Sequence, residues 1–390
     1  MQSENRHLNV IGLTTGDPWD LRNWSNIPFH LFGSLSHHTE AGGAVGVRAP
    51  YLFDRLLALS SAAKLRRFPS KRQLTGMVLR SRWRSTILGR RAESALRSFK
   101  KLNALNTVLS TTTLIDFAVI SMPVFPYIDA TFQLAIGSDS DFWRSIHPAS
   151  VERLDGLERD QLLRAKGILV FSSWVKESCT MHYGVPPERI EVVGYGANLP
   201  DVPDFSKKDV EKPYILFVCT DFAAKGGETI VKAFEIVQRW NPDVQLVIVG
   251  NVPKGIAAQM KAGVRLVGYR DKSEPAQLAE LLEIYKGASV LVLGSAFDPM
   301  PNVLFEAMYL KTPVVATKVC GIPEQVEEGR TGFLIPPLDA KSLADRLVAL
   351  LGNNELRWDM GVRGRERVEK LFTWDGVVDR SIRFISRSLG

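Results

Sequence analysis

Two carboxylates, Asp298 and Glu306, frame a short loop and the start of a predicted helix. Seven residues separate them, so Asp298 can point outward from the loop while Glu306 lies about one turn into the helix. The first N–H groups of that helix, at Asn302 and Val303, favour an anion. Hydroxyl groups for the acids and a phosphate for the amides indicate a ligand that carries both, such as a nucleotide-sugar. The alternative is structural: Asp298 and Pro301 begin the helix, and Glu306 is solvated.

The elements around these residues form a predicted βαβ unit. Ser289–Leu293 is a short apolar, β-branched run, and Thr312–Thr317 is another. Between them, Asn302–Leu310 has apolar residues at helical spacing. Parallel strands connected in this way place the loop at the carboxyl edge of a sheet, where open α/β sheets bind ligands.

A lysine stands at another predicted strand-to-helix turn. Tyr214–Val218 predicts a strand and Glu228–Arg239 a helix, with Lys225-Gly226-Gly227 just before the helix. Glycine lets the backbone approach a phosphate closely, and the ammonium adds positive charge. The segment is not a P-loop, because the first glycine and the Ser/Thr after the lysine are missing. An ordinary surface lysine is the alternative.

The N-terminal half carries less specific signals. The predicted strand Leu8–Leu13 leads into a long irregular segment, and Pro123–Ile128 is a strand that ends at Asp129. A buried carboxylate at a strand end costs several kcal/mol, on the order of 3, unless it is paired or faces a ligand. A turn or a helix cap is the alternative for Asp129. The candidate residues of the irregular segment are Asp17, Trp24, Ser25 and Asn26.

Other periodic segments complete the expected order of elements. Phe117–Ser121, Gly167–Phe171, Arg189–Val193, Asp243–Gly250, Val264–Gly268 and Gly332–Ile335 predict strands. Phe29–Leu35, Glu158–Ala165, Ser172–Tyr183, Glu274–Tyr285, Ala340–Leu351 and Val377–Ser388 predict helices, and most of 51–105 is expected to be helical.

The positive charge of the chain is concentrated in one stretch. The net charge is +7, and residues 64–101 hold thirteen Lys and Arg against one acid, Glu93. Basic amphipathic helices bind anionic membrane surfaces, and a solvated basic face is the plain alternative. Nucleic acid is not favoured as a partner, because no helix-turn-helix, RNA-binding or zinc signature accompanies the charges.

Composition limits the class of protein. The 390 residues suffice for two domains, and no run reaches the roughly 18 apolar residues that a membrane helix needs. The three cysteines, Cys179, Cys219 and Cys320, are widely spaced and form no metal or disulfide pattern. With no signal-peptide pattern at the start, a cytoplasmic location is expected, peripheral on the inner face of the membrane.

Three segments together resemble the donor-site signature of retaining GT-B glycosyltransferases of the GT4 type. They are Asp298-Pro-Met-Pro-Asn-Val-Leu-Phe-Glu306-Ala-Met, Thr312-Pro-Val-Val-Ala-Thr and Gly321-Ile-Pro-Glu324. The sequence departs from the family pattern where Asp298 replaces Glu, Lys311 replaces Gly, and Thr220 replaces the Arg that accompanies the lysine. The resemblance is strong over 165–375 and weak over 1–160.

The resemblance implies an α/β fold of the GT-B type, two Rossmann-like domains facing across a cleft. The N-terminal, acceptor-side domain would span 1–198 and be joined by a C-terminal helix at 376–390. A linker at 199–213 would lead to the donor domain at 214–375. The implied reaction moves a sugar, with retention, from a nucleotide-diphosphate-sugar to a hydroxyl of a glycan or lipid-linked acceptor, as in polysaccharide synthesis.

The resemblance also implies roles for individual residues, with no cofactor and no metal. Glu306 would bind the ribose hydroxyls and Asp298 the sugar hydroxyls. Asp129 would take the place of the family's histidine beside the reacting sugar. The implied donor-binding residues are Lys225, Gly226, Pro301, Asn302, Val303 and Arg270, and the acceptor-side loop is that of Asp17, Trp24, Ser25 and Asn26.

Two other functions fit the same fold. A non-catalytic adaptor could bind a membrane or polyanion through 64–101 on a degenerate GT-B fold, which the departures at Asp298 and Thr220 favour. A sugar-nucleotide epimerase is the other alternative, whereas no pyridoxal lysine site supports a phosphorylase.

Overall fold

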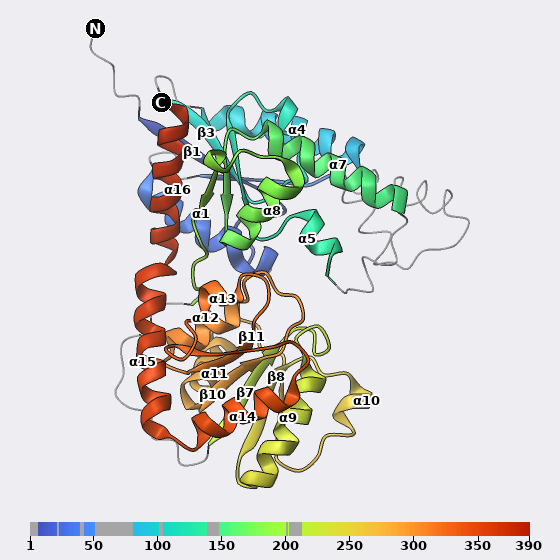
Figure 1. Cartoon of the computed structure of the whole chain (residues 1–390). Helices are drawn as coiled ribbons and strands as arrows, with labels where there is room; N and C mark the ends of the chain where they lie inside the picture. Colours follow the sequence, from blue (N-terminus) through green and yellow to red (C-terminus); the bar gives the residue numbers. More distant parts are fainter. Residues whose placement is uncertain are drawn as a thin grey trace. The chain divides into compact units, whose positions relative to one another are not determined.

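The computed structural model describes residues 7–21, 23–39, 43–50, 81–100, 104–138, 148–199, 202 and 213–390. Its contacts divide the chain into two compact units (Figure 1). The N-terminal unit comprises Met1–Gly196 and Trp374–Gly390, and the C-terminal unit comprises Ala197–Thr373. From the sequence we expected the chain to change domains near 198 and 375. Most of the predicted linker 199–213 lies outside the described residues.

The N-terminal unit is built on a parallel sheet of six strands in the order β2-β1-β3-β4-β5-β6. Neighbouring strands among these described ones pair in parallel, so their carboxyl ends share one edge. The strands are β1 (Leu8–Thr15), β2 (Ala44–Val47), β3 (Leu105–Ser110), β4 (Val124–Ile128), β5 (Ile168–Val170) and β6 (Ile190–Val192).

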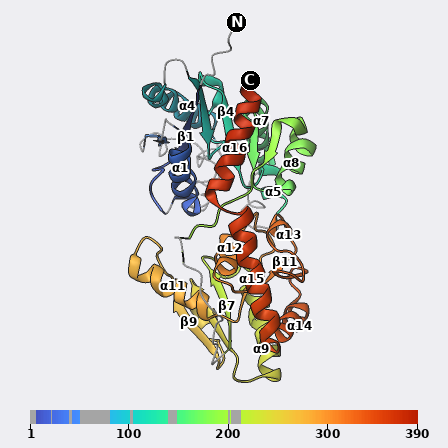
Figure 2. The same ribbon diagram turned by 90° about the vertical axis from the view of Figure 1, so that its left-hand side faces the viewer.

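Helices cover both faces of this sheet (Figure 2). On one face, Leu88 and Ala92 pack against Ile11 and Val108, and Val175 and its neighbours pack against the later strands. On the other face, the ring of Phe125 meets that of Phe384 edge to face, with the ring centroids 6.2 Å apart. The α-helices are α1 (Ile27–His38), α4 (Arg82–Leu96), α5 (Phe132–Ile136), α7 (Pro148–Arg164), α8 (Ser173–Tyr183) and α16 (Trp374–Leu389), and the short 3-10 helices are η1 (Asn23–Asn26), η2 (Arg97–Phe99), η3 (Phe117–Val119) and η4 (Pro187–Arg189).

One region of the N-terminal unit was predicted wrongly. Phe117–Ser121 is not a strand, because Asp116 caps η3 by accepting the Ala118 N–H at 3.1 Å, and Gln161 accepts the Phe117 N–H at 2.8 Å. The unpredicted β3 supplies the missing strand. Polar residues interrupt the apolar pattern of β3. The buried Thr107 is tolerated there because its hydroxyl donates to the Pro123 carbonyl at 2.9 Å.

The C-terminal unit has a second parallel sheet, in the order β12-β11-β10-β7-β8-β9. Its predicted strands are confirmed, with bounds that differ from the predicted ones by at most two residues. The strands are β7 (Tyr214–Cys219), β8 (Gln245–Gly250), β9 (Val264–Gly268), β10 (Val290–Leu293), β11 (Val314–Thr317) and β12 (Gly332–Ile335).

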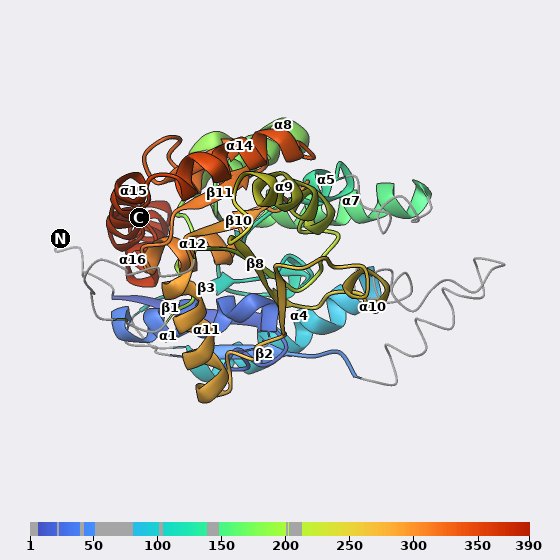
Figure 3. The same ribbon diagram turned by 90° about the horizontal axis from the view of Figure 1, so that it is seen from below.

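Helices α9 and α14 lie on one face of this sheet, and α11 and α12 on the other (Figure 3). The Asp339 side chain caps α14 by accepting the Ser342 N–H at 2.9 Å, as predicted. Helix α15 was not predicted, and its Gly361 passes so close to the Lys311 carbonyl that a Cβ would lie 2.2 Å away. The helices are α9 (Gly227–Trp240), α10 (Lys254–Ala257), α11 (Pro275–Gly287), α12 (Asn302–Tyr309), α13 (Ile322–Gln325), α14 (Ala340–Leu351) and α15 (Asn354–Leu371).

Part of the basic stretch 64–101 is described. Residues 64–80 and 101 lie outside the described part, as do residues 51–63, which were also expected to be helical. Within the described part, residues 82–96 form α4, residues 97–99 form η2, and Lys100 follows. Among the described helices, none is both long enough and apolar enough to cross a membrane.

Candidate functional site

The predicted site of the C-terminal unit lies at the carboxyl ends of β7 and β10. Lys225 follows β7, and Asp298 follows β10. The Lys225 Nζ lies 2.5 Å from the Asp298 Oδ2. Asp298 is buried, and its Oδ2 also accepts the Ser295 hydroxyl at 3.4 Å. The structure therefore brings together two residues that the sequence placed 73 positions apart, as a close ion pair.

The turn at Gly226 requires glycine. Its φ is +78°, and a Cβ there would lie 2.1 Å from the Gly294 carbonyl oxygen. The Gly294 N–H donates to the Lys225 carbonyl at 3.1 Å, so the loop after β7 is fixed against the end of β10. This close approach holds Lys225 and Asp298 at the same edge, and it leaves the first turn of α9 beside them.

Glu306 is completely buried in α12 and has three polar partners. The Tyr285 hydroxyl donates to its Oε2 at 2.7 Å, and the Asn302 amide and the Lys272 ammonium donate to its Oε1. Burial and the neighbouring carboxylate raise the pKa of Tyr285 well above its usual value, which keeps its hydroxyl a donor. A buried carboxylate needs this degree of compensation.

Lys272 was not selected from the sequence. It lies between β9 and α11, with only the pattern Tyr269-Arg-Asp-Lys272 to mark it. Its ammonium pairs with Glu306, and the pairing spans 34 residues of sequence. A signal existed in principle, because a carboxylate predicted to be buried in a helix requires a partner, but the sequence does not say which lysine supplies it.

The start of α12 is held from two directions. Pro301 precedes the helix, and its carbonyl accepts the buried Gln325 amide at 3.1 Å. The Asn302 Oδ1 accepts the Asn198 N–H at 3.2 Å while its amide donates to Glu306. Asn302 and Val303 are half-buried in the first turn, where N–H groups lack partners within the helix and favour an anion.

Arg270, a predicted donor-binding residue, makes hydrogen bonds within the C-terminal unit. Its guanidinium makes two parallel hydrogen bonds to Glu280, at 2.7 and 2.8 Å. It also donates to the carbonyls of Val267 and Tyr269. The hydrogen bonds that Arg270 donates to Glu280 raise the pKa of Arg270. Arg270 thus closes the turn between β9 and α11, which is the turn that carries Lys272.

Cys320 adds a thiol to the same region. Burial, and then the Asp298 carboxylate, raise its pKa, while a hydrogen bond from the Asp298 backbone lowers it, and the result is about 11. Within the described ranges, no three His, Cys, Asp or Glu side chains come together as a metal-binding group.

The predicted residues of the N-terminal unit lie in loops at one edge of the sheet. Asp17 follows β1 and Asp129 follows β4, and β3 lies between those strands. Asp17 is exposed, and its carboxylate accepts the Trp19 N–H at 2.9 Å. Asp129 is half-buried.

The loop after β1 has an unusual backbone. Trp24 has φ 39° and Asn26 φ 69°, in the left-handed region that favours glycine. Both belong to η1, which also contains Ser25, and Asn26 precedes α1. The Trp24 ring lies 5.9 Å from that of Phe171, which follows β5. Asn26 thus adopts a left-handed backbone conformation for which glycine is the usual residue.

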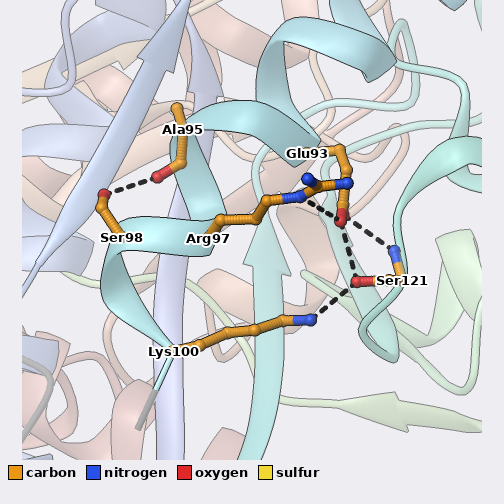
Figure 4. Close-up of polar contacts among 6 residues, drawn as sticks. All are labelled: Glu93, Ala95, Arg97, Ser98, Lys100 and Ser121. Atoms are coloured by element: carbon orange, nitrogen blue, oxygen red, sulfur yellow. Dashed lines mark hydrogen bonds and ion pairs between the residues drawn. The ribbon is translucent and has the colours of Figure 1, made fainter.

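Glu93 and Lys100 connect the end of the basic stretch to Ser121, before β4 (Figure 4). Glu93 accepts from Arg97 at 3.3 Å and from the Ser121 N–H at 2.9 Å, and Lys100 donates to the Ser121 hydroxyl at 2.9 Å. Burial raises the pKa of Glu93, but the hydrogen bonds from Ser121 and Arg97 outweigh it and lower the pKa.

Comparison with known proteins shows what the C-terminal unit is similar to. Residues 200–367 match the family described as glycosyl transferases group 1. The alpha-maltose-1-phosphate synthase of Mycolicibacterium smegmatis is 28% identical over 270 residues, which cover 61% of this chain and 69% of that protein. The D-inositol 3-phosphate glycosyltransferase of Paenarthrobacter aurescens is 30% identical over 206 residues, and the chain covers only half of its length.

Solved structures extend the likeness to the whole fold. Sucrose-phosphate synthase from Thermosynechococcus elongatus superposes with a TM-score of 0.67 at 18% identity, over 97% of this chain and 98% of that one. Anabaena Alr3699/HepE in complex with UDP-glucose gives 0.64 at 13% identity, over 97% and 99%. The two parallel sheets with flanking helices are those of the GT-B fold. Over residues 200–367, which are less than half of the chain, the sequence is thus similar to glycosyl transferases group 1.

Proposed function

We propose that the chain is a retaining hexosyltransferase of the GT4 type. It moves a sugar from a nucleotide-diphosphate-sugar to a hydroxyl acceptor, in the synthesis of a cell-surface glycan or polysaccharide. The observation that carries this proposal is the pair of lysine–carboxylate contacts, Lys225–Asp298 and Lys272–Glu306, around the start of α12. Support also comes from the solved Alr3699/HepE, whose complex contains UDP-glucose.

In the proposed reaction, the acceptor oxygen bonds to the anomeric carbon as the bond from that carbon to the diphosphate breaks on the same face. The hydroxyl proton passes to the leaving diphosphate. Lys225 and the first N–H groups of α12 stabilise the negative charge of the diphosphate, and one such donor contributes about 3 kcal/mol. Throughout the reaction, Asp298 accepts hydrogen bonds from the sugar hydroxyls of the donor and Glu306 from its ribose hydroxyls. Neither a metal nor an organic cofactor takes part in the proposed reaction.

A thermal-shift panel tests the donor site. UDP, GDP and ADP and their glucose conjugates are added to the purified chain, because a ligand of the folded state raises the melting temperature. We expect one base to give a shift that is lost in Lys225→Ala and reduced in Glu306→Gln. Lys261→Ala is the matched control, since Lys261 also pairs with a carboxylate, Glu235, but at an exposed place of the same unit. A shift that survives in all variants contradicts the site.

Hydrolysis of the same donors tests the reaction and its stereochemistry. Release of glucose with the α anomer formed first, followed by NMR, supports retention from an α-linked donor. A donor whose sugar is isomerised without release of the nucleotide favours an epimerase instead.

We further propose that the acceptor-side unit contacts an anionic membrane surface through α4. Trp83 is 76% exposed, and Arg90 and Arg91 are exposed seven and eight positions later, hence on the same helix face. Sedimentation with vesicles containing phosphatidylglycerol tests this contact, and Arg90→Glu with Arg91→Glu should reduce it. Vesicle binding without any nucleotide shift or hydrolysis favours the non-catalytic adaptor.

A further inference from the structure

The short helix α5 begins three residues after Asp129 and is capped entirely by side chains. The Phe132 N–H donates to the Glu158 Oε2, and the Gln133 N–H donates to the Tyr183 hydroxyl at 3.2 Å. The Leu134 N–H donates to the Thr131 hydroxyl oxygen at 3.3 Å. The first three N–H groups of a five-residue helix therefore depend on residues from α7, α8 and the cap position.

Glu158 is the centre of this arrangement. It lies in α7 and is 8% exposed. Its Oε2 also accepts the Tyr183 hydroxyl at 2.9 Å, and its Oε1 accepts the Thr113 hydroxyl at 3.4 Å. Thr113 follows β3, whereas Phe132 follows β4. One buried carboxylate thus connects the loops after two neighbouring strands, both at the carboxyl edge.

Tyr183 strengthens the connection. Burial, and then the Glu158 carboxylate, raise its pKa far above the usual value, so its hydroxyl keeps its proton. The hydroxyl accepts from Gln133 and lies 2.8 Å from the Asp155 Oδ1 as well as 2.9 Å from Glu158. A network of this kind rigidifies the segments it joins when its members are satisfied.

The segment that carries Asp129 is fixed on both sides. Before it, the Ile128 carbonyl accepts the Phe171 N–H at 3.2 Å, which ties β4 to the end of β5. After it, the Thr131 and Ser178 hydroxyls lie 2.6 Å apart, and Glu158 holds Phe132. Only Asp129 and Ala130 lie between these anchors.

We propose that Glu158 is a positioning residue that fixes Asp129 at the acceptor side of the reacting sugar. This inference rests on the proposed function, in which Asp129 lies beside the acceptor. Glu158 acts through the start of α5 and does not itself touch substrate. Displacement of a catalytic group by about 1 Å costs on the order of 100-fold in rate, so loosening this short segment should reduce turnover without affecting donor binding.

Gln161 offers a matched control on the same helix. It is 5% exposed and, like Glu158, accepts a backbone N–H, that of Phe117 at 2.8 Å. Its partner Phe117 belongs to η3, which precedes β4, and not to α5. We compare Glu158→Ala, Glu158→Gln and Gln161→Ala in the full chain.

Hydrogen exchange tests the clamp without any substrate. In Glu158→Ala the amides of 132–134 should lose protection, while Gln161→Ala should leave them protected and expose Phe117. Glu158→Gln should retain much of the protection, because its amide oxygen can still accept the Phe132 N–H. Unchanged protection of 132–134 in Glu158→Ala overturns the inference.

Kinetics tests the positioning role, with hydrolysis of UDP-, GDP- and ADP-glucose as probes. We expect kcat of Glu158→Ala to fall about 10- to 100-fold with KM for the donor within about twofold, and Glu158→Gln to recover most of the rate. Gln161→Ala should match the wild type in kcat. Full kcat in Glu158→Ala overturns the role even if the amides lose protection. Absence of any turnover by the wild type instead overturns the proposed function and the role with it, whatever the exchange data show.

Discussion

The two units hold their candidate residues in different ways. In the C-terminal unit the predicted carboxylates Asp298 and Glu306 are buried and paired with lysines. At the corresponding edge of the N-terminal unit, Asp17 accepts a backbone N–H, and Trp24 packs on Phe171. The first site is organised by charge, and the second by hydrogen bonds to the backbone and by aromatic packing.

This difference follows from what each unit is proposed to bind. A diphosphate and its sugars require cations and acids at fixed places, and a ligand-free site of that composition pairs its own charges. An acceptor hydroxyl requires little charge, so the shape of the loops matters more. The donor side should therefore be sensitive to loss of a charge, and the acceptor side to loss of a backbone anchor.

The largest expected effect is that of Glu306→Ala. It leaves Lys272 without its carboxylate and the buried Tyr285 hydroxyl without its acceptor. Breaking a buried pair in this way costs about 3 kcal/mol, and urea unfolding of the purified chain measures it. Glu280→Ala removes the partner of Arg270 in a more exposed, solvent-screened pair and should cost much less. Equal losses in the two variants would show that burial does not distinguish the pairs.

The C-terminal unit was also the more predictable from sequence. Its strands alternate regularly with helices, and β12 and α14 have the predicted bounds. Lys225, Asp298 and Glu306 were selected by residue type and spacing, because each stands at a strand end or in the first turns of a helix. Their contacts with one another, and the part of Lys272, depend on which loops meet in space, which spacing along the chain does not give.

Prediction was poorer in the N-terminal unit for a physical reason. Strand β3 carries the buried polar residues Thr107 and Ser110, whose hydroxyls are satisfied by backbone carbonyls. Such residues weaken the apolar pattern by which a strand is recognised. Glu158 was likewise read only as part of a helix, since the sequence does not show that α7 faces the start of α5.

The next effect concerns the reactivity of two buried thiols, Cys320 in the C-terminal unit and Cys179 in the N-terminal unit. The pKa of Cys320, raised mainly by burial, is about 11, against a usual value of about 9. At pH 8 its thiolate fraction is therefore about 100-fold lower than that of an ordinary thiol. Alkylation by iodoacetamide should be slowed accordingly and should rise about tenfold per pH unit up to pH 11. Cys179, buried within α8 of the N-terminal unit with a pKa of about 12, should react more slowly still. Peptide mass spectrometry measures both rates, and a Cys320 that reacts like free cysteine at pH 8 contradicts the assigned environment.

The smallest expected effect concerns Lys311, which stands where the resembling family has glycine. Its φ is 52°, a left-handed conformation that costs a non-glycine residue about 1 kcal/mol. Its ammonium lies 4.9 Å from the centre of the Trp358 ring, and such a contact contributes roughly 0.5–2 kcal/mol. The two terms oppose each other, so Lys311→Gly alone should change the free energy of unfolding by less than about 1 kcal/mol.

In a Trp358→Ala background the cation–π term is already lost, and there Lys311→Gly should stabilise by up to about 1 kcal/mol relative to that background. A double-mutant cycle measured by urea unfolding separates the terms. If Lys311→Gly has the same effect in both backgrounds, the ring contact does not offset the backbone strain.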